Sequence, residues 1–316
     1  MKGYVLAGSA GILWGLISLF GKLIVAFPVD PGAVVAIRAA LAFLFLAVPF
    51  LCFRPKLLRI GWSDVPFFMA LGLFGVAGAY LTYVYALKNT TVTTAVVIGY
   101  TYPAMVAVAA ALFLGEKFTR TKAIALVLAV TGCFFVAQGY NLNAVQMNSV
   151  GIMYSLGTAI ALTTYNILAK GAIKRYGPWT LSAYGFGFGA FWLFVIASPQ
   201  AVFSTHLPPA GWMILAAWVL IPTILGYALY LTALKYIEVS KASIVCTLEP
   251  VSAIVLACLF LGETIAPMQL AGAALVIAAV VVLSQAGQAQ TVEAIGASEP
   301  QCDEGRLVGS EVESAG

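Results

Sequence analysis

The sequence has little charge and almost no histidine, and both shortages exclude large classes of protein. Only 9% of its 316 residues are charged, whereas a soluble domain carries roughly a quarter. A chain with so few charges cannot cover itself with a water-facing surface. The single histidine, His206, excludes the His-rich metal sites of many membrane enzymes. We therefore expect neither a soluble fold nor a bound metal.

Other absences narrow the function further. The five cysteines contain no CxxC pair, and most lie in or beside apolar stretches, which indicates packing rather than a disulfide framework. No P-loop is present, so ATP is not the direct energy source, and no cofactor is expected. The net charge of +4 does not indicate a nucleic-acid partner in so apolar a chain. Residues 7–10 lie too early to be the cleavage site of a signal peptide.

What the chain does contain is hydrophobic residues, at 62% of the sequence with a mean hydropathy of +1.00. A spanning helix needs about 20 apolar residues. Charges, prolines and short polar clusters divide this chain into ten such stretches, so we predict an all-α integral membrane protein. The predicted spans are residues 3–26, 32–53, 64–87, 91–114, 121–140, 149–174, 178–201, 210–234, 240–262 and 267–286. Residues 288–316 are rich in Gly, Ser, Glu and Gln and are predicted to be a disordered cytoplasmic tail.

The basic residues predict the orientation. With the N-terminus in the cytoplasm, nearly all loop Lys and Arg residues fall on the cytoplasmic side, and only Lys88 falls clearly outside. We therefore expect a multi-pass protein of the inner (plasma) membrane with both termini in the cytoplasm.

Two stretches of the chain nearly repeat each other, residues 80–116 and residues 227–263. They align without a gap, and a shared proline, a shared lysine, two shared tyrosines and a closing Leu-Gly-Glu fall at one fixed offset. Upstream, Lys22 matches Lys170 at a similar spacing. The chain is thus predicted to contain two copies of one unit, residues 3–140 and 149–286. Because each copy has five spans, an odd number, the second copy enters the membrane inverted, which is a transporter architecture.

At this point the chain resembles a known family. The resemblance rests on four features of the first two spans, on a proline span that closes in Leu-Gly-Glu in each copy, and on the ten-span plan. The four features are Trp14-Gly15, Lys22, Pro31 and Arg38. Together they resemble the EamA-type branch of the drug/metabolite transporter superfamily, similar in plan to the YddG-like aromatic amino-acid exporters. The resemblance implies a ten-helix inverted-repeat fold and movement of small metabolites, often the export of amino acids.

The two copies differ in charge, so the resemblance does not fix the substrate. Tyr102 stands where the second copy has Glu249, and Gly185 stands opposite Arg38. Glu249 is the only acidic residue deep in a span, where an unpaired charge costs roughly 3 kcal/mol. It either contacts a substrate ammonium or a coupling proton, or pairs structurally with Lys22 or Arg38, or caps the frayed helix.

Pro103 and Pro250 lie near the middle of their spans and are expected to break the helices there. Backbone groups freed in this way need protein or a water-filled cavity to satisfy them, so the breaks either line the substrate cavity or simply kink the helices for packing. Arg38 either meets a substrate carboxylate or holds an outer gate. Lys22 either takes part in the site or snorkels to the surface.

The remaining candidates for substrate contact are polar and aromatic. Trp14 and Ser18 share one face of the first span, beside a GxxxG pair that favours close helix packing. The rings are either cavity lining or ordinary core and interface residues. The predicted substrate-binding set is Trp14, Ser18, Arg38, Tyr80, Tyr83, Tyr100, Tyr102, Tyr165, Asn166, Tyr227, Tyr230 and Glu249.

The leading hypothesis is a secondary transporter of small metabolites, with amino acids or related amphipathic compounds as exported substrates. Its expected partners are the bilayer and that small molecule, and it is expected to act as a monomer or homodimer. One alternative is a facilitator or channel for another small metabolite. An integral membrane enzyme would need a cluster of His, Asp or Glu or an activated nucleophile, and Glu249 stands alone.

Overall fold

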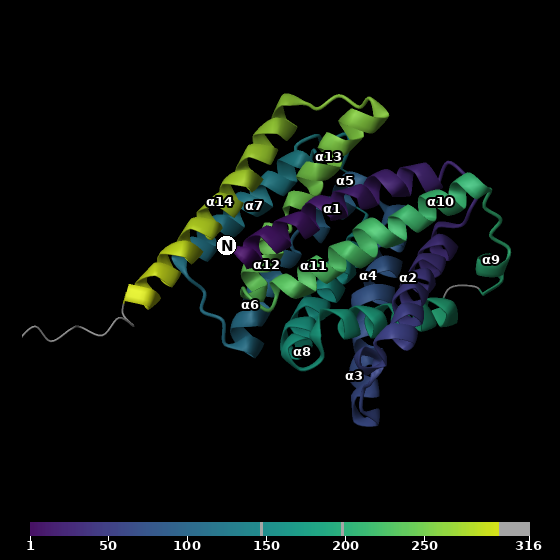
Figure 1. Cartoon of the computed structure of the whole chain (residues 1–316). Helices are drawn as coiled ribbons and strands as arrows, with labels where there is room; N and C mark the ends of the chain where they lie inside the picture. The colour runs from purple at the N-terminus through teal and green to yellow at the C-terminus, as the bar shows by residue number, and fades with distance from the viewer. Residues whose placement is uncertain (146–147, 197–198, 297–316) are drawn as a thin grey trace, which may run out of the picture.

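The computed structural model describes residues 1–145, 148–196 and 199–296, and the regular secondary structure of these residues is helical, without a strand. Figure 1 shows the helices gathered into one bundle, with α14 and α7 along one edge. The longer elements are α1 (Lys2–Ile24), α2 (Pro31–Phe53), α3 (Val65–Gly72), the π-helix η3 (Leu73–Gly78), α4 (Ala79–Asn89), α5 (Val92–Gly99), α6 (Tyr102–Leu114), α7 (Arg120–Val136), α8 (Ser149–Ile196), α10 (Pro209–Trp218), the π-helix η4 (Val219–Leu225), α11 (Gly226–Ala233), α12 (Val239–Val245), α13 (Leu248–Leu261) and α14 (Pro267–Gly296). Short turns η1 (Pro55–Leu58), η2 (Trp62–Asp64) and α9 (Pro199–Phe203) join them.

Eight helices of the described chain are long and apolar enough to cross a membrane, where the sequence predicts ten spans. Two features account for the difference. The 48-residue α8 covers two predicted spans, which meet at Gly177, where φ is 74° and ψ is 169°, just before Pro178. Helix α7, with 17 residues, is shorter than the about 20 of a typical span.

The C-terminal helix is longer than predicted. Helix α14 continues to Gly296, into the segment for which the sequence predicts disorder from residue 288. The rest of that predicted tail, residues 297–316, lies outside the described residues.

The structure repeats itself at the offset of the sequence repeat. A π-helix occurs in each half, as η3 and as η4. Each proline span is divided into two helices, α5 and α6 in one half and α12 and α13 in the other. The second helix of each pair ends at a glycine in the left-handed conformation, Gly115 or Gly262, both with φ 67°.

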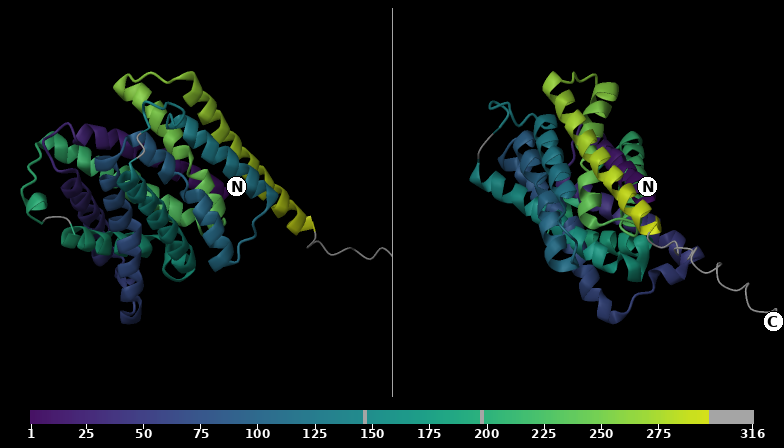
Figure 2. Two further views of the ribbon diagram at one scale, coloured as in Figure 1. Left: turned by 180° about the vertical axis from the view of Figure 1, so that it is seen from behind. Right: turned by 90° about the vertical axis from the view of Figure 1, so that its left-hand side faces the viewer.

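Small residues bring helices together. Helices α7 and α14 run side by side in both views of Figure 2. A Cβ added to Gly132 would lie 2.7 Å from the carbonyl oxygen of Gly272, so the two backbones are in direct contact. At the centre, α1 packs on α11 and α13, and α8 packs on α2, α3 and α4. The core between them holds the polar and aromatic side chains that the sequence analysis selected.

Candidate functional site

Arg38 is a buried cation without an anion. It lies on α2, which begins at Asp30, whose side chain accepts a hydrogen bond from the backbone N–H of Ala33. The arginine is 3% exposed. Within the described chain it forms no ion pair, and its buried Nε has no hydrogen-bond acceptor. Its guanidinium instead lies over two rings, 4.3 Å from the centroid of Tyr80 and 4.7 Å from that of Trp218.

Aromatic rings surround this cation. Trp14 of α1 lies 5.2 Å, between ring centroids, from both Tyr227 and Tyr230. Tyr165 of α8 lies 5.9 Å, between ring centroids, from Tyr227, which lies within range of the charge of Arg38.

Two further features fix this ring cluster. The Tyr230 hydroxyl donates a hydrogen bond to Oδ1 of Asn166. The indole nitrogens of Trp14 and Trp218 are buried and, like Arg38 Nε, have no acceptor within the described chain. Three unused N–H donors therefore occur on side chains of one cluster.

Glu249 forms the second part of the site. It lies in the first turn of α13, just after the break that separates α12 from α13. The hydroxyls of Tyr83, Tyr100 and Tyr102 lie within range of its charge. Although deep in its span, Glu249 is only partly covered by the rest of the described chain. A carboxyl placed so is available to a positively charged group.

The structure excludes two of the structural partners considered for Glu249. Lys22 pairs with Glu263 instead, and Arg38 forms no ion pair with any described residue. The backbone around Glu249 is held separately, because the hydroxyl of Ser252 donates to the carbonyl oxygens of Glu249, at 2.9 Å, and Ile12, at 3.1 Å.

The predicted residues thus fall into two groups that adjoin. One surrounds Arg38, and the other surrounds Glu249. Tyr102 belongs to the second and lies within electrostatic range of Tyr230 in the first. Ser18 is exposed on α1, and no hydrogen bond in the described chain joins it to either group. The prolines Pro103 and Pro250 lie in the first turns of α6 and α13, directly after the helix breaks.

Trp218 is the site residue that the sequence analysis missed. It ends α10 inside an otherwise apolar span, next to the π-helix η4. No polar neighbour in the sequence marks it, and its copy-one counterpart is not aromatic. Only its position over Arg38 in the fold reveals it.

A cluster of charges lies away from this site. Lys122 is 3.4 Å from Glu116 and 3.0 Å from Glu238, and Lys241 is 2.9 Å from Glu238. Burial opposes ionisation of Glu238, but the hydrogen bonds and charges of Lys241 and Lys122 outweigh it and hold the pKa of this carboxyl below its ordinary value.

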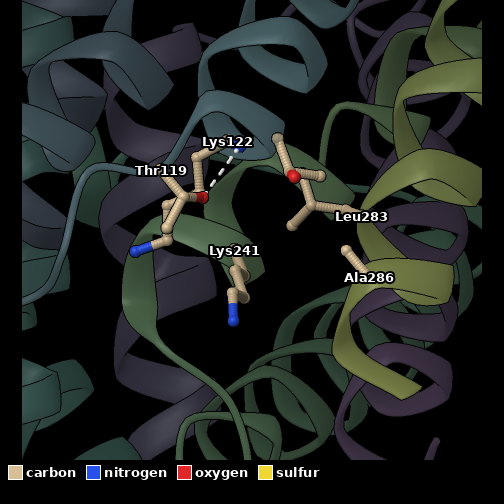
Figure 3. Close-up of a pocket in the computed structure, with 6 residues that line it drawn as sticks. Thr119, Lys122, Lys241, Leu283 and Ala286 are labelled. Atoms are coloured by element: carbon tan, nitrogen blue, oxygen red, sulfur yellow. Dashed lines mark hydrogen bonds between the residues drawn. The ribbon is translucent and has the colours of Figure 1, made fainter. Parts of the chain in front are cut away.

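Two pockets occur outside the site. Beside the charge cluster is a pocket of about 50 Å³, lined by Lys122 and Lys241 on one side and by Leu283 and Ala286 of α14 on the other (Figure 3). A second, of about 330 Å³, lies between α3 and α8, where Arg175 is 2.9 Å from Asp64. Neither reaches Arg38 or Glu249, so the argument for function rests on those side chains and not on these pockets.

The comparisons with known proteins agree with a transporter. The profile of the EamA-like transporter family matches residues 1–138 and 149–285. An uncharacterized transporter of Archaeoglobus fulgidus is 25% identical over 273 residues, which cover 86% of this chain and 93% of that protein. The threonine/homoserine exporter RhtA of Escherichia coli (strain K12) is 28% identical over 254 residues, which cover 79% of this chain and 80% of RhtA.

A protein of known crystal structure has the same fold. It superposes with a TM-score of 0.75 at 16% identity, over 94% of this chain and 99% of its own. With family profile matches over most of its length, this chain belongs to the EamA-like transporter family and is a multi-pass membrane protein that carries a small molecule.

Proposed function

We propose that this protein is a secondary transporter that exports amino acids or related amphipathic metabolites across the inner membrane by alternating access. The observation that carries the proposal is Arg38, a guanidinium 3% exposed with no acidic partner in the described chain. A buried charge is costly, so it persists where a ligand supplies its counterion. A substrate carboxylate fits this need.

The donors around Arg38 suit a carboxylate in number and kind. A carboxylate has two oxygens and about four lone-pair positions, and the arginine fork binds it with two parallel bonds. Trp14 and Trp218 each hold an indole N–H that has no acceptor among the described residues. These are donors alone, so they favour an acceptor ligand and reject an ammonium group.

Glu249 supplies the opposite charge. Because it is not paired with Arg38 or Lys22, its carboxyl is available to a substrate ammonium or to a coupling proton. A cation-binding carboxyl and an anion-binding guanidinium, separated by rings, together favour a zwitterion with an apolar or aromatic body. The relative RhtA, a threonine/homoserine exporter, agrees with an amino acid as substrate.

The proposed mechanism uses two inverted copies. We take α8 as two spans that meet at Gly177 and α7 as a short span, which gives ten spans in two five-span halves. The π-helices η3 and η4, and the left-handed Gly115 and Gly262, support equivalence of the halves. Rocking of one half against the other then exposes a midplane site to each side in turn, with both termini in the cytoplasm.

A facilitator or channel is the second candidate, and counterflow distinguishes it from a carrier. Purified protein is reconstituted in liposomes preloaded with one amino acid, and uptake of the labelled compound is followed with and without a pH gradient. A carrier gives transient accumulation above equilibrium, whereas a channel gives none.

A panel of substrates tests the two charged side chains of the site, Arg38 and Glu249, separately. It pairs an aromatic and a small neutral amino acid with the matching amide, which lacks the carboxylate, and with the matching deaminated acid, which lacks the ammonium. We expect exchange of the amino acid alone. Exchange of the amide at the rate of the amino acid would refute a carboxylate site at Arg38.

A further inference from the structure

A carboxylate of the first half binds the backbone of the second half. Glu116 follows α6 in the first copy, and its side chain is 7% exposed. Its oxygens accept hydrogen bonds from the backbone N–H of Val239, at 2.7 Å, and of Ser240, at 3.3 Å, and from the Ser240 hydroxyl. Residues that are far apart in the chain are thereby joined across the two halves.

A lysine holds the same segment from its other end. Lys170 of α8 donates from Nζ to the carbonyl oxygens of Leu234 and Ile237, both at 2.6 Å. Residues 234–240, which connect α11 to α12, are therefore held by a cation on their carbonyls and by an anion on their N–H groups. We call Glu116, Lys170 and this segment the inner clamp.

The counterparts of the clamp residues lie at the other end of the bundle, and there they do not bind the backbone segment. By the sequence repeat, Glu263 matches Glu116, Lys22 matches Lys170, and residues 87–93 match residues 234–240. Here Lys22 and Glu263 pair with each other, and their side chains are 53% and 51% exposed. Neither Val92 nor Thr93 donates its backbone N–H to an acceptor in the part of the chain that the structure describes.

The two glutamates start from the same local geometry. Each follows a glycine with φ 67° and donates its own backbone N–H back into the preceding helix, Glu116 to Ala110 at 3.1 Å and Glu263 to Ala257 at 3.4 Å. What differs is the partner of the side chain and not the backbone that carries it. The backbone at Glu263 thus allows its side chain to bind a segment of the opposite half, as the side chain of Glu116 does.

The clamp and the open pair lie at opposite ends of α1. Near its start, a Cβ on Gly3 would lie 2.7 Å from the side chain of Ile237, inside the clamped segment. Near its end is Lys22, in its last turn. A helix of 23 residues is about 35 Å long at 1.5 Å per residue. The two sets of charges therefore face the two sides of a membrane.

We propose that Lys22 and Glu263 form the outer counterpart of the inner clamp. When the outer side closes, this pair separates, Lys22 takes carbonyls at the end of α4, and Glu263 takes the N–H groups of Val92 and Thr93. The inner clamp opens in the same step. The structure then represents the protein closed inside and open outside. This inference depends on the two inverted copies of the proposed function, but on no particular substrate.

A difference between the halves biases this equilibrium. Lys122 supports the inner clamp, because it lies beside Glu116 and is almost fully buried. Its counterpart is Gln269, which is buried and donates to the carbonyl of Val136 at 3.0 Å. The outer clamp therefore lacks a supporting cation, and an exposed ion pair competes with its formation. Outward opening is the favoured resting state.

The test measures both ends of the full-length protein in liposomes without substrate. In a background free of native cysteines, spin labels are placed at Lys117→Cys and Lys235→Cys for the inner end. The counterpart positions, Lys88→Cys and Thr264→Cys, report on the outer end. All four side chains are exposed, so labels leave the core intact. We expect a short inner distance and a mostly long outer distance, with a minor short component.

The variants separate a clamp from a simple surface ion pair. Glu263→Gln and Lys22→Gln are each expected to reduce the short outer component at least threefold. The double variant Lys22→Glu with Glu263→Lys keeps an ion pair, but it would place a carboxylate at the carbonyls and an ammonium at the N–H groups of residues 87–93. The short outer component is therefore expected to stay reduced. Recovery of the short component in that double variant would overturn the proposal, as would unchanged distances in the single variants.

The inner variants serve as the matched comparison. Lys170→Gln is expected to lengthen the inner distance and raise the short outer component in the same sample. No amino acid enters these measurements, so failure of the substrate proposal leaves the result intact. An outer distance that never shortens in any variant would overturn the clamp even if amino-acid exchange is observed.

Discussion

Replacing Arg38 by methionine should have opposite effects on stability and on binding. Methionine fills a similar apolar volume without the charge. If Arg38 binds a ligand, its buried charge destabilises the empty protein but stabilises the complex with substrate. A structural arginine would behave differently, because its loss would weaken both.

The magnitudes follow from the surroundings of the guanidinium. An uncompensated charge deep in the membrane costs about 3 kcal/mol. The two cation–π contacts, at 4.3 and 4.7 Å, return about 1 kcal/mol each. Arg38→Met should therefore raise the free energy of unfolding of the empty protein by about 1 kcal/mol. Loss of a charge-assisted carboxylate contact costs about 3 kcal/mol of binding, which is about a 100-fold weaker affinity.

Two measurements on the same preparation decide the matter. Thermal unfolding in detergent is followed without substrate, and substrate affinity is taken from the concentration dependence of counterflow. Arg38→Lys is the control, since it keeps the charge but loses the fork, and about a tenfold loss of affinity is expected for one lost bond of about 1.4 kcal/mol. An Arg38→Met protein that unfolds several degrees earlier, or that exchanges substrate as the parent does, would refute the reasoning.

Three further predictions follow from other parts of the structure. Glu249→Gln should insert and fold normally but lose most transport and any dependence on a pH gradient; transport equal to the parent would remove this carboxyl from the mechanism. Gly132→Ala should lower the free energy of unfolding by about 1–3 kcal/mol, seen as earlier thermal unfolding, because its Cβ would meet the Gly272 carbonyl at 2.7 Å; Gly171→Ala, with open space around it, is the matched control. Because the pKa of Glu238 is lowered in the folded protein, its contribution is present above the ordinary carboxyl pKa and is lost as the pH falls through the folded value; stability measured downward from pH 6 should show this loss below about pH 4.5, and Glu238→Gln should remove it.

The sequence predicts the spans well because their boundaries depend on local chemistry. Asp30 and Pro31 begin α2 near the predicted residue, and Gly115 and Gly262 end the two proline spans as their Leu-Gly-Glu motifs indicate. The count of continuous helices is harder to predict. At Gly177 the chain turns within one residue, so two spans join into one long helix with a kink and no polar loop separates them.

Tertiary packing explains what the sequence could not predict. The π-helix η3 contains Gly75, where a Cβ would lie 2.2 Å from the ring of Tyr165, so its backbone approaches α8 closely. Nothing in residues 73–78 alone requires this. The position of Trp218 over Arg38 also depends on how α10 crosses α2.

The conformational state is likewise absent from the sequence. The repeat makes Glu116 and Glu263 equivalent, yet in the structure one is buried against the opposite half and the other is half exposed. Equivalent sequences in unequal surroundings are what a molecule with two alternating states presents when it is seen in one of them. Under the clamp proposal, the unequal surroundings of these two glutamates correspond to the state that is closed inside and open outside.

The two charges of the site come from different halves, and this has a consequence for coupling. Arg38 belongs to the first copy and has Gly185 as its counterpart in the second, whereas Glu249 belongs to the second copy and has Tyr102 as its counterpart in the first. A zwitterion that engages both side chains therefore links the halves, whereas a ligand with one charge contacts only one of them. A ligand shifts a conformational equilibrium only by its difference in affinity between the states. If transport proceeds by the proposed rocking, the distance between the halves changes, so the affinity of a linking ligand depends on the state more strongly than that of a ligand with one charge. We therefore propose that the divergence of charge between the two copies is what couples a zwitterionic substrate to the conformational change.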